Sequence, residues 1–189
     1  MKKFLVLMVL VCAALSTPAQ GLKWKVGLGI GSIAGSDNDG VESAISYKIG
    51  ASYELEISES FFIEPALIIN NKNFKIKNVS GTIDRYFLEV PVLAAYKLYF
   101  DKFTLILNAG PYAAYGLFGS DIEFDGAGTI NIFDKDGGYE RFEAGIETGA
   151  KVAFNSITVG IDFNRALTKC DSNYKQYSQV IGLTLGYRF

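Results

Sequence analysis

Alternation of apolar with small or polar residues runs through most of this chain and is very regular over its last thirteen residues. In 177–189 the apolar and aromatic side chains take the odd positions, interrupted by Gln179, and the small or polar ones take the even positions, apart from Val180. A period of two places alternate side chains on opposite faces of an extended strand. Such a strand is about twice as long as is usual in soluble proteins and suits a tilted membrane crossing.

The same alternation recurs along the chain and predicts an all-β fold. The predicted strands are 22–30, 43–57, 61–72, 85–98, 103–117, 139–154, 157–168 and 177–189. The connections between them are alternately long and short, as in outer-membrane barrels with tight periplasmic turns and longer outer loops. We therefore predict an eight-stranded antiparallel up-and-down transmembrane β-barrel, formed by a single domain over 21–189, with both termini on the periplasmic side.

The first twenty residues have the features of a secretory signal peptide. Lys2 and Lys3 precede an apolar segment, 4–15, and small residues follow as far as Ala19. The apolar segment is too short to span a bilayer as a helix. We expect residues 1–20 to be removed during export across the inner membrane, and the mature chain to lie in the bacterial outer membrane.

Alternation alone leaves open which face lines the barrel. A soluble, lipocalin-like periplasmic barrel would enclose its apolar face around a ligand. The polar face, however, is mostly Gly, Ala and Ser with a few charges, which suits the narrow interior of an eight-stranded membrane barrel. Aromatic residues also gather near the strand ends, as they do at lipid headgroups. The predicted periplasmic girdle is Trp24, Phe61, Tyr96, Phe103, Phe154, Tyr187 and Phe189, and the outer girdle is Tyr47, Tyr86, Tyr115, Phe142 and Tyr177.

Charged residues on the inward face require partners in a dry lumen. If the first hairpin turns at 39–40, Lys23 lies opposite Glu56 and Lys25 opposite Glu54. We predict an ion-pair network that plugs the lumen, with separate solvation of these groups in a wet lumen as the alternative. Its members are Lys23, Lys25, Glu54, Glu56, Glu64, Glu89, Arg141, Glu143, Glu147, Lys151 and Arg188.

Three prolines fall inside predicted strands. Pro65, Pro91 and Pro111 each remove a backbone donor from the strand ladder. Proline in a sheet is normally confined to edges or bulges, and a closed barrel has no edge. We therefore expect a local bulge at each of the three.

The absence of histidine limits the chemistry that the chain can perform. It excludes Ser-His-acid and Cys-His arrangements, and with them the histidine-containing sites of outer-membrane proteases, acyltransferases and lipid A deacylases. Glu143 and Glu147 could do acid–base work but fit the inward network better. The turns 37–40 and 134–137 lack the further oxygen ligands of a complete Ca²⁺ loop, and Cys170 is a spare thiol. We expect no enzyme activity, cofactor or metal.

Several strand motifs go beyond alternation. They read FFIEPAL at 61–67, FLEVPVLAAYKL at 87–98 and LNAGPYAAY at 107–115. These motifs resemble the PorT-like outer-membrane β-barrel family of Bacteroidetes-type bacteria. The ending with Tyr187 and Phe189 is similar to the C-terminal assembly signal of small OmpA/OmpX-like barrels. The resemblance implies folding by the barrel assembly machinery and supplies no catalytic residues; the family's namesake assists protein secretion, and most members have no assigned role.

The prediction for function is a small integral outer-membrane protein with a structural or loop-mediated interaction role, including a role accessory to secretion. The alternatives are a narrow pore for ions or small solutes and a soluble ligand-binding barrel. The expected partners are outer-membrane lipid, lipopolysaccharide and the assembly machinery, with the chain as a monomer. The net charge of −2 becomes more negative when the leader's two lysines are removed, which argues against nucleic acid as a partner.

Overall fold

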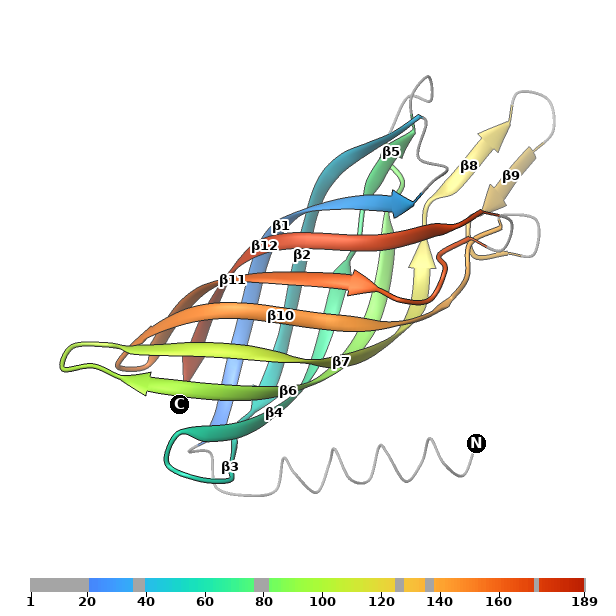
Figure 1. Ribbon diagram of the computed structural model, residues 1–189. Coiled ribbons are helices and arrows are strands. Elements are labelled where there is room, and N and C mark those ends of the chain that lie inside the picture. The colour runs from blue at the N-terminus through green and yellow to red at the C-terminus, as the bar shows by residue number, and fades with distance from the viewer. Residues whose placement is uncertain are drawn as a thin grey trace.

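A closed antiparallel barrel forms the body of the molecule in the computed structural model, which describes residues 21–35, 40–76, 82–124, 128–134, 138–171 and 174–188. Its strands are β1 (Leu22–Gly35), β2 (Val41–Tyr53), β4 (Phe61–Asn71), β6 (Arg85–Tyr99), β7 (Thr104–Gly119), β10 (Phe142–Phe154), β11 (Ile157–Ala166) and β12 (Gln176–Arg188). Each pairs with its neighbours in the chain, and β12 pairs with β1 to close the barrel (Figure 1). The predicted eight-stranded up-and-down barrel is confirmed.

Four short strands accompany the eight long ones, and two of them extend the barrel wall. β3 (Leu55–Glu56) continues the line of β2 beside β4, and β5 (Phe74–Ile76) pairs with the start of β2. β8 (Asp121–Phe124) and β9 (Gly128–Asn131) form a separate hairpin that projects beyond the barrel (Figure 1). The segments 73–84 and 118–138, predicted as irregular loops, thus contain strands. No helix in the described ranges is long and apolar enough to cross a bilayer.

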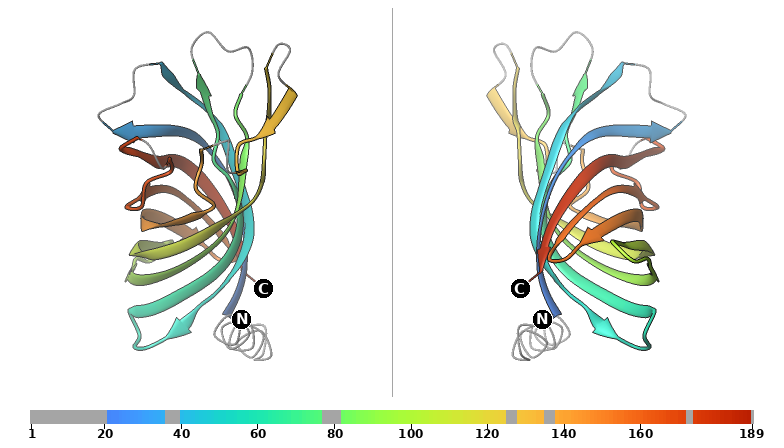
Figure 2. Two further views of the ribbon diagram at one scale, coloured as in Figure 1. Left: turned by 90° about the vertical axis from the view of Figure 1, so that its right-hand side faces the viewer. Right: turned by 90° about the vertical axis from the view of Figure 1, so that its left-hand side faces the viewer.

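The two ends of the barrel differ in character. Both Leu22 and Arg188 lie at the end where the chain makes its short turns, which we call the turn end; the longer connections and the β8–β9 hairpin lie at the opposite, loop end (Figure 2). The tightest turn joins β10 to β11, and there Asn155 has a φ of 52°. Asparagine tolerates this left-handed conformation better than most residues.

The apolar face of the barrel points outward. Leu28, Ile45 and Leu183 are 69%, 72% and 62% exposed, whereas the neighbouring Ser46 and Thr184 are buried. A continuous apolar exterior of this kind requires a lipid environment. The prediction of an outward apolar face is confirmed, and the soluble barrel with an apolar interior is excluded.

Aromatic side chains face one another across neighbouring strands at both ends. The cross-strand pairs are Trp24–Tyr187 and Phe61–Tyr96 at the turn end, and Tyr115–Phe142 toward the loop end. On the outer wall the Tyr47 and Tyr86 hydroxyls share a hydrogen bond, and the ring of Tyr86 stacks on Phe118 at 4.5 Å. Rings at these heights suit the two headgroup regions of a bilayer. Phe189 lies outside the described residues.

The three strand prolines lie close together around Val92 of β6. Pro65 pairs with Val92, while paired residues are missing opposite Pro91 on β4 and opposite Pro111 on β6. The register is the same on both sides of each gap, and the irregularity between β6 and β7 lies at Tyr86 instead. The prediction of a bulge at each proline is wrong, because a missing donor interrupts the ladder without inserting a residue.

Candidate functional site

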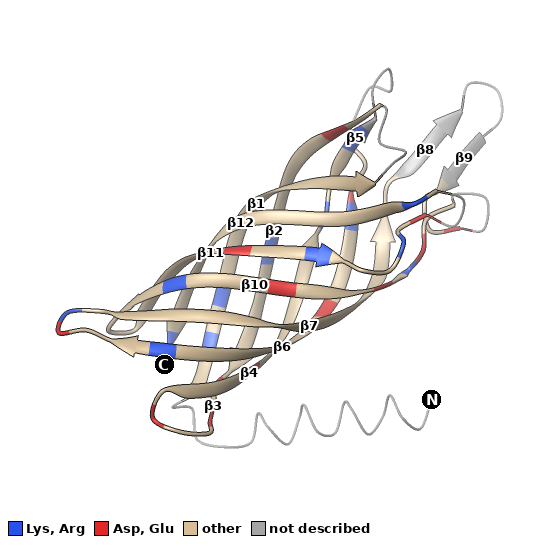
Figure 3. Cartoon of the chain, viewed as in Figure 1, with Lys and Arg blue, Asp and Glu red and all other residues tan. Residues whose placement is uncertain are grey.

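Charged side chains fill the barrel lumen. The charged residues are spread over most of the strands (Figure 3). Those in the lumen form three groups. The turn-end cluster is Lys23, Lys25, Glu54, Glu64 and Lys97; the middle cluster is Lys48, Glu147, Lys151 and Asp162; the loop-end cluster is Lys72, Arg85, Glu89 and Glu143. Strand alternation explains their position, because each is in phase with the small residues of the inward face.

In the turn-end cluster, two carboxylates serve three lysines. Glu54 forms ion pairs with both Lys23 and Lys97. Glu64 forms an ion pair with Lys25, and its second oxygen lies 3.6 Å from the Lys23 ammonium. These side chains are almost fully buried, so the ion pairs are little screened by solvent.

Asp162 is the hub of the middle cluster. Its two oxygens lie 3.1 Å from the Lys48 ammonium and 3.4 Å from that of Lys151, and it accepts a hydrogen bond from the Thr184 hydroxyl. The inward glycines make room for these long side chains. A Cβ at Gly27, for example, would lie 2.9 Å from Cγ of Lys48.

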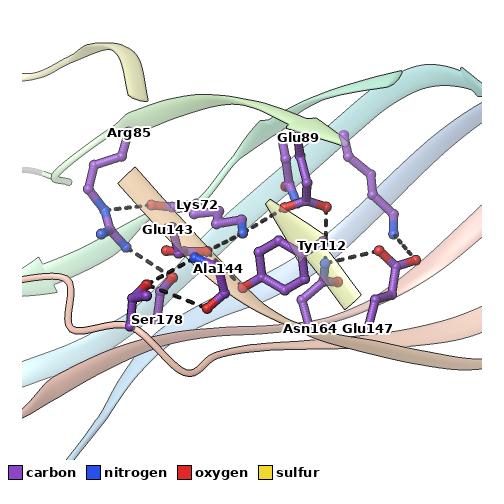
Figure 4. A network of polar contacts seen from close by, with 12 residues as sticks. Lys72, Arg85, Glu89, Tyr112, Glu143, Ala144, Glu147, Asn164 and Ser178 are labelled. Carbon is purple, nitrogen blue, oxygen red and sulfur yellow. Dashed lines mark hydrogen bonds and ion pairs between the residues drawn. The ribbon is translucent and has the colours of Figure 1, made fainter. Parts of the chain in front are cut away.

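Lys72 holds two buried carboxylates together in the loop-end cluster (Figure 4). Its ammonium lies 2.5 Å from Glu143 and 2.7 Å from Glu89. The Tyr112 hydroxyl donates to Glu143 at 2.8 Å, and the Asn164 amide donates to Glu89 at 3.1 Å. The same amide reaches Glu147 at 3.1 Å and so connects the loop-end cluster to the middle cluster.

Arg85 is a buried cation beside this group. Its guanidinium donates to the Lys72 carbonyl at 3.1 Å and to the Ser178 hydroxyl at 3.3 Å, and it lies 5.0 Å from the centre of the Phe74 ring. Facing aromatic rings are an environment that a weakly hydrated guanidinium tolerates well. Arg85 therefore joins the polar lumen to the apolar residues above it.

An apolar cap covers the loop end of the lumen. Its buried members are Ile33, Phe74, Ile83, Phe87, Tyr112, Ala114, Ile132, Phe133 and Cys170. Phe133 folds inward over Gly116, where a Cβ would come within 2.7 Å of the ring. Glycine at 116 is thus required for the ring to lie against the barrel wall.

The thiol of Cys170 is buried in the cap, and it is only 3% exposed. Desolvation by this burial raises its pKa to about 11. Because the thiolate is the reactive form, we expect maleimide labelling of the folded protein at pH 8 to be at least ~100-fold slower than labelling after boiling in detergent. A Cys170→Ser/Ser43→Cys variant, with its thiol at an exposed position, should label quickly in both states. Rapid labelling of the folded wild type would contradict the capped position.

Most residues of the predicted network do line the lumen. The inward ones are Lys23, Lys25, Glu54, Glu64, Glu89, Glu143, Glu147 and Lys151. The predicted cross-strand pairs are wrong: Lys23 lies opposite Ser52 and Lys25 opposite Gly50. The observed register is shifted by four residues from a hairpin centred on 39–40. Glu56 keeps the inward register, opposite the buried Phe62, but it lies in β3 at the end of the barrel wall and is exposed.

The two predicted arginines lie outside the three clusters. Arg141 is partly exposed at the loop end and donates to the carbonyls of Gly116 and Leu117 at 3.1 and 3.4 Å. Arg188 is exposed at the turn end and forms no ion pair with any described residue. The prediction missed Lys48, Lys72, Arg85, Lys97 and Asp162, although their even or odd numbering places all of them on the inward face.

Free space in the lumen is unevenly distributed. Beside the middle cluster, a cavity lined by Lys48, Asn70 and Asp162 measures about 10 Å³. A second cavity of about 10 Å³ lies at Lys25 and Glu64. Each is the size of a single water site. A larger cavity of about 240 Å³ opens at the turn end.

The two turns weighed as Ca²⁺ loops, 37–40 and 134–137, and the predicted C-terminal signal lie partly outside the described residues. Of the two D-x-D-G turns, only Gly40 and Asp134 are described. In the part of the chain that the structure covers, no group of three His, Cys, Asp or Glu side chains could hold a metal ion. Of the C-terminal signal, Tyr187 lies on the outer wall and is 50% exposed.

Comparison with known proteins gives a family match and a shared fold. Residues 4–189 match the model of the family described as "Outer membrane protein beta-barrel domain". The crystal structure of Neisserial surface protein A has a TM-score of 0.56 at 12% identity, covering 89% of this chain and 97% of that one. The crystal structure of the outer membrane enzyme PagL has a TM-score of 0.55 at 11% identity, covering 87% and 99%. No curated protein sequence matches the chain significantly.

Proposed function

The chain belongs to the family of outer membrane protein β-barrel domains, and on this premise we propose that it is an integral outer-membrane protein with a plugged lumen, acting through its structure and its outer loops. In this proposal the turn end faces the periplasm and the loop end faces outward. The lumen serves as a rigid scaffold, and the connections at the loop end make contacts with other molecules.

The ion pairs across the lumen carry this proposal. Lys72 bridges carboxylates from β6 and β10, and Lys48 reaches from β2 to Asp162 on β11, so charged side chains cross the interior at two heights. The apolar cap lies above them. A conducting pore would need a continuous water-filled path, whereas the cavities at the two inner levels each have the volume of one water.

Conductance measurements test the plugged lumen. We expect purified protein in planar bilayers to give no steady open-channel currents. An Ile132→Ala/Phe133→Ala variant truncates one aliphatic and one aromatic side chain of the cap. It should also give no currents, because the ion pairs below still close the lumen. Steady currents from the wild type would instead support the alternative of a narrow pore for ions or small solutes.

A finer assignment to the PorT-like barrels is part of the proposal and rests on the motifs at 61–67, 87–98 and 107–115. A role accessory to secretion would then operate through contacts at the loop end or the turn end rather than through passage of cargo, since the lumen is filled. Comparison of the proteins released by a deletion strain with those released by its parent and by the complemented deletion strain tests this role.

The remaining parts of the proposal concern chemistry and partners. A non-catalytic role is supported by the absence of histidine and by the engagement of Glu143 and Glu147 in the lumen contacts. Export of the chain with its leader, residues 1–20, and insertion by the barrel assembly machinery would bring it to its membrane. Outer-membrane lipid, with lipopolysaccharide in the outer leaflet, would then surround a monomer.

A further inference from the structure

The cavity of about 240 Å³ at the turn end is lined mainly by cationic and neutral polar groups. We call it the vestibule. The residues that matter for its chemistry are Lys23, Lys97, Tyr99, Thr104, Asn155 and Arg188. By volume it has room for several water molecules, whereas the two inner cavities each hold one. It is therefore large enough for a small hydrated or partly dehydrated ligand.

Positive charge exceeds negative charge around the vestibule. Lys23 and Lys97 share the single carboxylate of Glu54, and Glu64 is paired with Lys25. Arg188, which is paired with Lys23 across the β1–β12 joint, forms no ion pair with any residue that the structure describes. Two buried carboxylates thus face four cations; Glu56 and Glu59 lie near Tyr99 but are exposed, do not line the cavity and form no ion pair with these cations.

The vestibule is closed on its inner side. Ile106 lines its wall and packs with Phe62 and Ala95 in a buried apolar cluster. The Lys97 ammonium lies 3.7 Å from the centre of the Phe62 ring, which holds the charge on the wall of the cavity. Beyond Ile106, the space around Lys25 shrinks to a cavity of about 10 Å³. An anion that enters would therefore be retained beside the cations and not pass through the barrel.

We propose that the vestibule at the turn end is a binding site for a phosphate group, presented either as free phosphate or as a phosphomonoester headgroup of a lipid. Lys23, Lys97 and Arg188 would supply the charge, and Thr104 and Asn155 further donors at the mouth. A dianionic phosphate offers enough oxygens to accept from all of these groups and balances the excess of two positive charges. A carboxylate would satisfy fewer donors. This inference does not depend on the role proposed for the outer loops.

Isothermal titration calorimetry of the detergent-solubilised protein with inorganic phosphate, in a phosphate-free zwitterionic detergent, tests the site. We expect saturable 1:1 binding that weakens as KCl is added. Arg188→Gln should weaken it at least about tenfold, because an exposed charge-assisted contact is lost without disturbing an internal ion pair. Lys97→Gln should weaken it at least as much. Lys102→Gln, which removes an exposed lysine from the turn at the same end, should leave it unchanged.

Gel mobility with and without boiling shows which variants are folded, so that a loss of binding is not mistaken for a loss of structure. A second titration with dihexanoyl phosphatidic acid distinguishes the sources. Binding of this lipid alone, with the same dependence on Arg188, supports the site and identifies a headgroup as its ligand. Absence of saturable binding for both ligands, or equal binding by Arg188→Gln and Lys102→Gln, would overturn the proposal.

Discussion

Replacement of Lys72 with methionine is expected to lower the free energy of unfolding by about 3–5 kcal/mol, the cost of removing one partner from a buried ion pair. Lys72 lies between Glu89 and Glu143, and the three side chains are almost completely buried. Methionine retains most of the volume, so the change isolates the charge. Two carboxylates would then face each other without a cation between them. Urea unfolding in phospholipid vesicles, followed by the mobility of unboiled samples on gels, measures the loss.

Two further variants make this test specific. Lys75→Met removes an exposed lysine three residues away and should change stability by no more than about 0.5 kcal/mol. The triple variant Lys72→Met/Glu89→Gln/Glu143→Gln should recover most of the lost stability, because neutral amides need no counterion. If Lys72→Met unfolded at the same urea concentration as Lys75→Met, the loop-end cluster would not be a buried ion-pair network.

Introduction of arginine at Leu183 is expected to cost about 2–4 kcal/mol, the penalty for this residue near the midplane of a membrane barrel. Leu183 is central in β12, is 62% exposed, and lies opposite Leu28 and Ile161 on the two neighbouring strands. Its side chain therefore points away from the lumen into the hydrocarbon. Reversible unfolding of the wild type and the variant in phospholipid vesicles gives the difference directly.

Ile57→Arg provides the matched control. Ile57 has nearly the same exposure, 63%, but lies in the short turn between β3 and β4. Arginine there should cost only about 0–1 kcal/mol, as at a membrane interface. Equal costs at the two positions would contradict the placement of Leu183 in the hydrocarbon region of the bilayer.

Side-chain alternation was sufficient to predict the barrel, because a register of period two determines which residues share a face. The same rule places Lys48, Lys72 and Asp162 on the inward face, yet the predicted ion-pair network did not include them. Glu56 shows the limit of the rule: it keeps the inward phase opposite Phe62, but it lies at the end of the barrel wall, where the inward phase does not ensure burial.

The partners within the lumen could not be predicted from cross-strand neighbours alone. Lysine side chains are long enough to cross a narrow barrel, so Lys72 meets Glu143 from a strand that is not adjacent in the wall. The apolar cap was also unpredictable, because Ile132 and Phe133 come from a segment whose polar and Gly-rich composition is typical of a solvated loop. Distances across a closed barrel depend on strand tilt and stagger, which local sequence does not specify.

The interrupted ladders at Pro91 and Pro111 have a consequence for how the cylinder comes apart. The joint between β12 and β1, where the chain meets itself, is continuous over thirteen residue pairs, from Lys23–Arg188 to Gly35–Gln176. The β4–β6–β7 wall instead carries two gaps close together. Amide hydrogen exchange should accordingly be fastest in the β4–β6–β7 wall, and the β1–β12 ladder should be the last to open.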